Sequence, residues 1–190
     1  MVSTAPFETE VDDLTLARAR RGDLDACERL YRQFQGPVYT VTVRIVNCRA
    51  LAQDVSQDAF ITAFRRLEQF RGDAPFWGWL RRLAVNHAIS ALRRQPKGEL
   101  VTFEDYRASC EGAQDGIGRA MDLDEALSHL DPEDRAVVWL YDVEGYRHQE
   151  IAELFGKTES FSKTRLSRAR HKLREMIGQQ EAQGLANAGS

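Results

Sequence analysis

Apolar residues recur every three or four positions along most of this chain, which is the pattern that amphipathic α-helices produce. One run, residues 38–46, is apolar and β-branched enough to resemble a strand, but its neighbours are helical and we interpret it as a helix. The pattern therefore predicts an all-α fold. The clearest stretch is residues 49–70, with apolar positions at Leu51, Val55, Ala59, Phe60, Ala63, Phe64 and Leu67.

Glycine and proline residues divide this pattern into separate helices. Gly36-Pro37 predicts a break, and the sequence RGDAP at residues 71–75 predicts a loop. The expected helices of this first part are residues 12–21, 23–35, 38–46, 49–70 and 76–94.

A second group of helices follows a stretch rich in glycine and acids. Asp131-Pro132 predicts a helix start, because Asp can cap a helix and Pro suits its first position. Further on, the pattern predicts a short helix that Gly156 ends, a turn, and a longer helix capped by Thr158 or Ser160. A short helix, a turn and a longer helix are typical of a helix-turn-helix domain.

We therefore expect two small helical domains joined by a flexible acidic linker. The domains span residues 12–95 and 121–178, the linker spans residues 96–120, and residues 179–190 form a disordered tail.

The net charge of −3 hides a segregation of charge along the chain. Residues 81–97 carry five Lys and Arg and no acid, and residues 163–175 carry six against one acid. Between them, residues 99–125 carry eight acids against two Arg. Because local fields govern nucleic-acid binding more than net charge does, we expect one DNA contact on each domain.

The basic segment 163–175 combines its charges with an apolar stripe that includes Leu166 and Ala169. A helix anchored on one side and cationic on the other can lie in a DNA major groove. The alternative is a solvated surface helix, but such helices normally mix charges of both signs. An arginine near the start of this helix, Arg165 above all, can bond a guanine edge with two donors.

Other functional classes have little support in the sequence. The four histidines lack metal-ligand spacing, and the three cysteines are odd in number and far apart, so we expect no metal, no cofactor and no disulfide framework. The sequence shows no catalytic arrangement of residues, so we do not expect an enzyme. No apolar run could cross a membrane, and the N-terminus is too polar for a signal peptide, so we expect a cytoplasmic protein.

Several segments, taken in order, resemble the extracytoplasmic-function (ECF) sigma factors of bacteria. In the first domain they are QGPVY, QDVSQDAFITAFRRLEQFRGDAPF and WL followed by RRLAVNHAISALRR. In the second they are LDPEDRAVVWLYDVEGY, EIAELFG and TRLSRARHKLRE. The resemblance covers roughly residues 20–178. It implies that the first domain docks on core RNA polymerase and opens the downstream (minus-10) promoter element, while the second recognises the upstream (minus-35) element.

The resemblance also implies roles for individual residues. On the helix 49–70, the polar side chains would bind the clamp helices of the polymerase's largest subunit, although a solvated helix face is an equal alternative from the sequence alone. Near the start of the helix 76–94, Trp77 would be the exposed aromatic, while Phe76 and Trp79 pack inside. The expected contacts are Asp54, Gln57 and Asp58 for polymerase, Trp77, Arg82, Asn86 and Arg93 for the downstream element, and Arg147, His148, Ser162, Lys163, Thr164, Arg165 and Arg168 for the upstream element.

Two departures from the family pattern affect these expectations. Ser160-Phe161-Ser162 stands where many relatives have Gly-Thr-Val, and Phe161 either packs beneath the helix or touches a thymine methyl group. Ser90 stands where relatives often carry an acid. The upstream DNA sequence therefore cannot be carried over from relatives.

Two functional classes remain as predictions. A sigma factor would be a monomer when free, would recognise an asymmetric two-part site, and would be held inactive by an anti-sigma partner. Its acidic linker would be either a simple tether or a segment that enters the polymerase cleft. The rival is a stand-alone helix-turn-helix regulator, which would be a stable dimer on a palindromic site.

Overall fold

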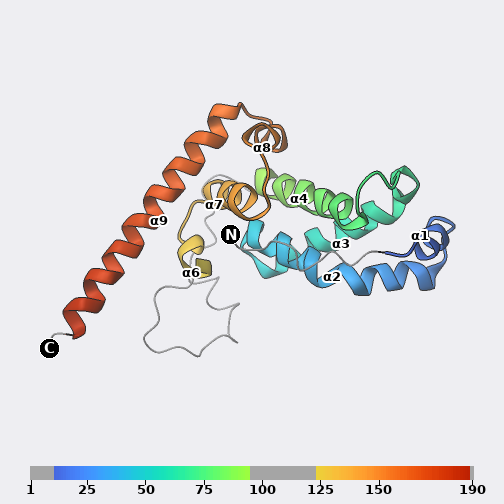
Figure 1. The fold of residues 1–190 in the computed structure, drawn as a ribbon, viewed down its shortest axis with the longest axis horizontal. Coiled ribbons are helices and arrows are strands. Elements are labelled where there is room, and N and C mark those ends of the chain that lie inside the picture. The colour runs from blue at the N-terminus through green and yellow to red at the C-terminus, as the bar shows by residue number, and fades with distance from the viewer. Residues whose placement is uncertain (1–10, 95–122, 189–190) are drawn as a thin grey trace. The chain divides into compact units, whose positions relative to one another are not determined.

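The computed structural model describes residues 11–94 and 123–188, with side chains for residues 11–94 and 126–178. Every regular element in these ranges is helical, which confirms the predicted all-α class (Figure 1). The chain divides into two compact units between Arg94 and Gln95. The expected acidic linker, residues 96–120, lies outside the described residues.

The first unit is a bundle of three long helices with a short helix at its start. Helices α2, α3 and α4 each pack against the other two, and α1 packs on α2 (Figure 1). Their bounds are α1 Asp13–Arg20, α2 Leu24–Val46, α3 Arg49–Arg65, the 3₁₀ turn η1 Leu67–Gln69 and α4 Phe76–Arg94.

Side-chain caps fix the starts of α1 and α2. The carboxylate of Asp12 accepts a hydrogen bond from the Thr15 backbone N–H at 2.7 Å, and that of Asp23 accepts from the Ala26 N–H at 3.1 Å. The pKa of both carboxyl groups is lowered. The main cause at Asp12 is a hydrogen bond from the Thr15 hydroxyl, and the main cause at Asp23 is one from the Arg18 side chain. The two backbone bonds add to these effects. Such caps satisfy amide groups that a helix start leaves without a partner.

Helix α2 continues through Gly36-Pro37, so the predicted break at this position is wrong. Pro37 removes one backbone donor from the helix interior. On either side of it, Phe34 and Val38 are buried in the core, so both halves of the helix pack against the same core. Tertiary packing therefore overrides the local signal, and the strand-like run 38–46 is helical as predicted.

Two further helix ends differ from the sequence prediction. The helix expected over residues 49–70 ends as an α-helix at Arg65 and closes with the 3₁₀ turn η1. At the other end of the chain, α9 continues to Ala188, where we expected a disordered tail from residue 179. Ala, Gln and Glu make up seven of the ten residues 179–188, and all three favour helix.

The second unit consists of short helices packed against one long helix. Helix α9 packs against α6, α7 and α8 (Figure 1). Pro132 is the first residue of α7 and Gly156 ends α8 in the left-handed conformation (φ 63°), as the sequence predicts. The elements are α6 Leu123–Ser128, α7 Pro132–Val138, the π-helical turn η2 Trp139–Val143, α8 His148–Phe155 and α9 Glu159–Ala188.

The described residues contain no helix that is both long and apolar enough to span a membrane.

Candidate nucleic-acid interface

Helices α8 and α9 form a helix-turn-helix, and two side-chain contacts join them. The Nδ1 atom of His148 lies 3.0 Å from the Oγ atom of Ser162. The rings of Phe155 and Phe161 pack with their centroids 5.4 Å apart. Both contacts link the start or end of α8 to the first turn of α9, so they set how α9 is presented.

Ser162 and His148 have a structural role in place of the predicted free DNA contact. Ser162 is fully buried, so its hydroxyl cannot face a DNA groove. The ring of His148 is half-buried and stacks on Tyr141, with centroids 4.4 Å apart. Only the outer edge of His148 is left for a contact outside the domain.

Arg165, the strongest candidate for a base contact, turns toward α7 instead. Its guanidinium donates to Oδ1 of Asp134 at 3.0 Å and also pairs with Glu133. Asp134 is fully buried, and a buried carboxylate needs a compensating charge. Arg165 supplies that charge and is only 24% exposed, so in this structure its guanidinium is engaged inside the domain. The base contact of Arg165 stays a prediction.

Phe161 packs beneath the helix, which decides between the two roles left open for it. Besides its contact with Phe155, its ring lies under the guanidinium of Arg165, 5.4 Å from centroid to Cζ. The ring is half-buried by these neighbours. The large side chain at the turn therefore supports Arg165 and joins α8 to α9.

Two more cations of α9 are matched by acids of the same unit. Arg170 pairs with Asp142 at 2.5 Å and lies over the ring of Tyr141. Lys172 lies 3.8 Å from the carboxylate of Asp131, which precedes α7 and makes no side-chain cap there. Three of the six cations in residues 163–175 thus lie near acids of α7, of η2 or of the residue before α7.

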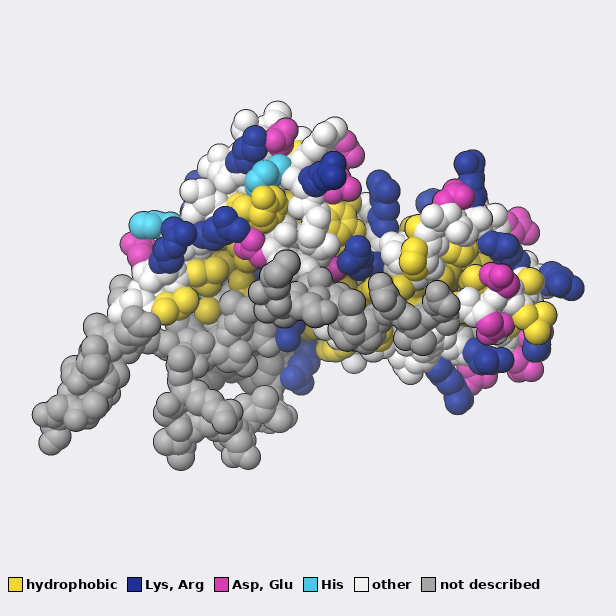
Figure 2. Space-filling model, viewed as in Figure 1, with side chains coloured by type: hydrophobic (Ala, Val, Ile, Leu, Met, Phe, Trp, Pro, Cys, Tyr) yellow, Lys and Arg dark blue, Asp and Glu magenta, His cyan; other side chains and the backbone are white. Residues whose placement is uncertain are grey.

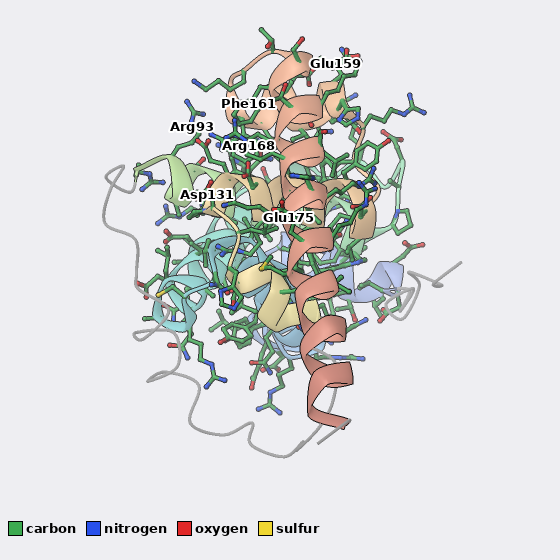
Figure 3. The ribbon with its side chains drawn as sticks, turned by 90° about the vertical axis from the view of Figure 1, so that its left-hand side faces the viewer. Arg93, Asp131, Glu159, Phe161, Arg168 and Glu175 are labelled. Carbon is green, nitrogen blue, oxygen red and sulfur yellow. The ribbon has the colours of Figure 1, made fainter. Side chains whose placement is uncertain are left out.

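The remaining cations of this segment are exposed. Lys163 pairs with Glu159 one turn earlier at 2.7 Å, and this contact lowers the pKa of Glu159. Arg168 and Arg174 are exposed, and within the described residues neither forms an ion pair. Figure 3 shows Glu159 in the first turn of α9 and Arg168 and Glu175 farther along it.

Six exposed residues of α9 share one face, and one of them, Ser167, was not predicted from the sequence. Ser167 is exposed four residues after Lys163 and three after Thr164, so helical spacing places it between them and Arg168. Helical spacing predicts Ser167 on this face, but Ser167 carries no charge, and charge was the signal that selected the other residues. This outward face consists of Lys163, Thr164, Ser167, Arg168, His171 and Arg174.

The side chain of Arg147, and not its backbone amide, is the group that could contact a phosphate. Its N–H donates to the carboxylate of Glu150 at 2.8 Å, which caps the start of α8. The amide that we expected to suit a phosphate is therefore already paired. The exposed guanidinium of Arg147 remains available beside α9.

On the first unit, the polar residues predicted for the downstream element lie on one exposed face of α4. Arg82, Asn86 and Arg93 are separated by four and seven residues, which returns to the same side of a helix. The Asn86 amide donates to the Arg82 carbonyl at 2.8 Å. The three residues therefore share one exposed face of α4, and their contact with DNA stays a prediction.

Trp77 is not the exposed aromatic that the family pattern implies. Its ring stacks on Phe34 of α2, with centroids 5.9 Å apart and planes 3° apart, and it is half-buried. Trp79 is equally half-buried against Phe70 and Phe76. Because α4 starts at Phe76, its first turn faces the core, and the preceding loop 71–75 is the exposed part of this region.

The residues predicted to bind polymerase are exposed on α3. Asp54, Gln57 and Asp58 lie on the side opposite the buried alanines of that helix. Ile61, which sequence analysis missed, lies on the same side and is 47% exposed. An apolar side chain among polar ones is the arrangement of an interface centre surrounded by a polar rim.

The two faces of this unit are linked by a hydrogen bond between α3 and α4. Nε2 of His87 lies 2.9 Å from the hydroxyl of Thr62. Burial lowers the pKa of His87; Asp58 acts against this, and Arg94 and Arg66 add to it. The imidazole is therefore held toward its neutral form.

Comparison with known proteins gives the family. The family model described as "Sigma-70 region 2" matches residues 30–97, and "Sigma-70, region 4" matches residues 120–173. The RNA polymerase sigma-H factor of Pseudomonas aeruginosa is 36% identical over 177 residues, covering 85% of this chain and 91% of that protein. The chain is an ECF-type sigma factor of the sigma-70 family. The ECF sigma-E factor of Escherichia coli is 32% identical, covering 86% of this chain and 92% of its own.

Solved structures share the fold of this sigma factor. RpoE of Bartonella quintana, in complex with the anti-sigma factor NepR, has a TM-score of 0.53 at 19% identity and is covered over 96% of its length by 80% of this chain. CnrH, in complex with the cytosolic domain of CnrY, has a TM-score of 0.51 at 24% identity, with 87% and 96% covered.

The two family matches fall on the two compact units of the sigma factor, whose boundary in the sequence lies between Arg94 and Gln95. Region 2 contains α3 and α4 with their exposed polar faces, and region 4 contains the helix-turn-helix. Helix α1 lies before the region 2 match. Membership of the family favours the sigma-factor prediction over the stand-alone regulator.

Proposed function

We propose that this sigma factor binds core RNA polymerase through the exposed face of α3 and directs it to promoters with two separate elements. The upstream, minus-35 element would be recognised by α9 and the downstream, minus-10 element by α4 and the loop before it. The observation that carries the proposal is that Arg165 pairs with acids of α7 inside the domain, whereas Lys163 and Arg168 are exposed on α9.

The outward face of α9 supports recognition of the upstream element in the major groove. Lys163, Thr164, Ser167 and Arg168 occupy its N-terminal half, the part of a recognition helix that contacts base edges. Arg168 takes the role first expected of Arg165, because its guanidinium is exposed and can bond a guanine with two donors. Releasing Lys163 from Glu159 costs little, since both groups are solvated.

The flanks of this face would position the domain on the DNA backbone. Arg174 lies farther along the same side of α9, and Arg147 lies exposed before α8. Phosphate contacts of this kind fix register without reading sequence. The outer edge of His148 can join them, whereas Ser162 contributes only by holding His148 in place.

On the first unit, α4 supports contact with the duplex beside the melted downstream element. Arg82 and Arg93 are exposed on one face and suit phosphates, while Asn86 lies between them. The loop 71–75, exposed throughout, would meet the single strand. Trp77 would assist as a packed support rather than as an open stacking platform.

The face of α3 supports docking on a basic surface of the polymerase's largest subunit. Asp54 and Asp58 supply negative charge, and Gln57 and Ile61 complete the face. Acidic groups at the rim steer association, whereas a central apolar side chain supplies more of the affinity.

An anti-sigma partner is the remaining part of this proposal. Two solved sigma factors with this fold are in complex with partner proteins, NepR and the cytosolic domain of CnrY. We infer that this sigma factor is likewise a cytoplasmic monomer when free, controlled by such a protein.

The test is transcription in vitro with purified core polymerase and a library of promoter fragments. We expect start sites downstream of a shared two-part sequence, and none with core polymerase alone. Absence of any sigma-dependent transcript, together with a stable dimer on a palindromic site, would refute the proposal and favour a stand-alone regulator.

A further inference from the structure

The loop before α4 is exposed but anchored at both ends. Residues 71–75 are all exposed, and Gly72 adopts the left-handed conformation (φ 83°) that glycine permits. The residues that flank the loop, Phe70 and Phe76, are buried and their rings meet edge to face, with centroids 5.5 Å apart. The position of the loop therefore depends on where these two anchors are held.

The Phe76 anchor belongs to the core. Its ring packs against Phe34 of α2 at 5.4 Å between centroids, and it starts α4. The Phe70 anchor follows the short turn η1 and has no long helix of its own. Its ring packs against Phe76 and Trp79, both in the first turn of α4.

A side chain from α1 holds the Phe70 anchor from another direction. Arg20, the last residue of α1, donates from Nη2 to the carbonyl oxygen of Phe70 at 2.5 Å. The same guanidinium lies over the Phe70 ring, 5.9 Å from its centroid. One cation thus fixes both the backbone and the ring of the residue that begins the loop, across 50 positions of sequence.

Arg20 contributes this contact from the surface rather than from the core. Its side chain is exposed, and surface arginines in this part of the unit are interspersed with acids, as Figure 2 shows around the α1 end. The acceptor is a neutral carbonyl group, so the contact is a hydrogen bond with a cation–π contact and not an ion pair. Its specific effect is on the geometry of residues 70 and 71, at the start of the loop.

We propose that Arg20 is a positioning residue for recognition of the downstream promoter element, acting through Phe70 on the loop 71–75. The inference rests on the proposed function of this loop and adds a role for α1, which lies outside the region 2 match. The bases would contact the loop, and Arg20 would set the position from which the loop meets them.

The experiment uses holoenzyme, with the downstream and upstream elements defined by mapped start sites. A labelled single-stranded oligonucleotide carries the non-template strand of the downstream element, and a second oligonucleotide carries base substitutions in it. Binding of a duplex that carries the upstream element reports on the second domain. The variants are Arg20→Met, Arg20→Lys and, as a matched control, Arg21→Met, which removes an adjacent exposed charge.

For Arg20→Met we expect the preference for the correct over the substituted strand to fall by about fivefold, the low end of what stacking of one base contributes. Binding of the upstream duplex should stay within about twofold, since phosphate contacts of α9 are untouched. Arg20→Lys keeps a cation and a donor and should retain most of the preference, and Arg21→Met all of it.

Three outcomes would overturn the inference. The first is an unchanged preference in Arg20→Met. The second is an equal loss on both strands and on the upstream duplex, with a lower melting temperature, because Arg20 would then act only in folding. The third is the same loss in Arg21→Met, which would reduce the effect to net charge. If wild-type holoenzyme itself prefers no downstream sequence, the proposed function fails and this inference with it.

Discussion

The fully buried carboxylate of Asp134 lies 3.0 Å from the guanidinium of Arg165. This pair joins α7 to the recognition helix α9 across 31 positions of sequence. It also directs this arginine away from the surface that we propose contacts DNA. The helix is therefore held at a defined orientation by charges that look, in the sequence, like DNA contacts.

The first prediction concerns this ion pair. Arg165→Ala leaves a buried charge without its partner and should lower the free energy of unfolding of the second unit by about 3–5 kcal/mol, as for other broken buried pairs. Chemical denaturation of the full chain measures this. DNA affinity should fall equally on specific and nonspecific sequences, because the loss is structural. A stable Arg165→Ala variant that loses only sequence specificity would restore Arg165 as a base contact.

The second prediction compares two cations one helical turn apart on α9, of which only Lys172 lies near an acid among the described residues of the same unit. Arg168→Ala should weaken binding of the upstream element by about 5- to 150-fold, which corresponds to about 1–3 kcal/mol for a bidentate base contact. Lys172→Ala removes the same charge near Asp131 and should change binding much less. Equilibrium binding of holoenzyme to matched and mutated duplexes measures both. Equal losses in the two variants would show that α9 acts through net charge alone.

The third prediction tests the docking face of α3. If Ile61 lies at the centre of the interface, Ile61→Ala should weaken binding to core polymerase by about tenfold, because truncating a central, desolvated interface residue can cost more than about 1 kcal/mol. Leu24→Ala is the matched control, since Leu24 is exposed on α2 and away from this face. Competition for labelled core polymerase gives the affinities. If the two variants bind alike, Ile61 lies outside the interface.

The fourth prediction is a pH dependence of stability. Burial lowers the pKa of His87 below its ordinary value, so the folded state binds this proton less well than the unfolded state. Stability should therefore fall as the pH drops below about 6.5, the ordinary pKa of histidine. Urea denaturation at about pH 7.5 and pH 5.5 measures the change, and His87→Gln should reduce it. The capped carboxyls of Asp12 and Asp23 lose their contribution only at lower pH, because their pKa values are lowered from an acidic starting point.

Most of the fold follows from local pattern, and the exceptions have a common cause. Helical spacing, the Asp131-Pro132 start and the Gly156 end predict the elements of the second unit. The break expected at Gly36-Pro37 does not occur, because Phe34 and Val38 are buried on both sides of it. Periodicity shows which residues share a face, but not which partner from a distant segment will cover them.

The same limit applies to the candidate site. The cationic character of α9 is visible in the sequence, yet the partners of Arg165 come from α7 and those of Arg170 from η2. Helical spacing places Arg165 next to the buried Ala169, four residues on, but also next to the exposed Arg168, three residues on, so it does not decide which way Arg165 turns. Ser167 could be found by its spacing. Trp77 could not, because its contact with Phe34 depends on how α2 and α4 cross.

The sorting of charges on α9 has a consequence for how binding responds to salt. Each cation that neutralises a phosphate releases a condensed counterion, and the slope of log K against log salt counts those cations at about 0.9 each on duplex DNA. Arg165 neutralises the buried carboxylate of Asp134, so it should displace few ions from the duplex. The pairs of Arg170 and Lys172 are solvated and can be exchanged for phosphates at little cost. The salt slope of α9 should therefore fall short of what its six basic residues would give, by about the share of Arg165.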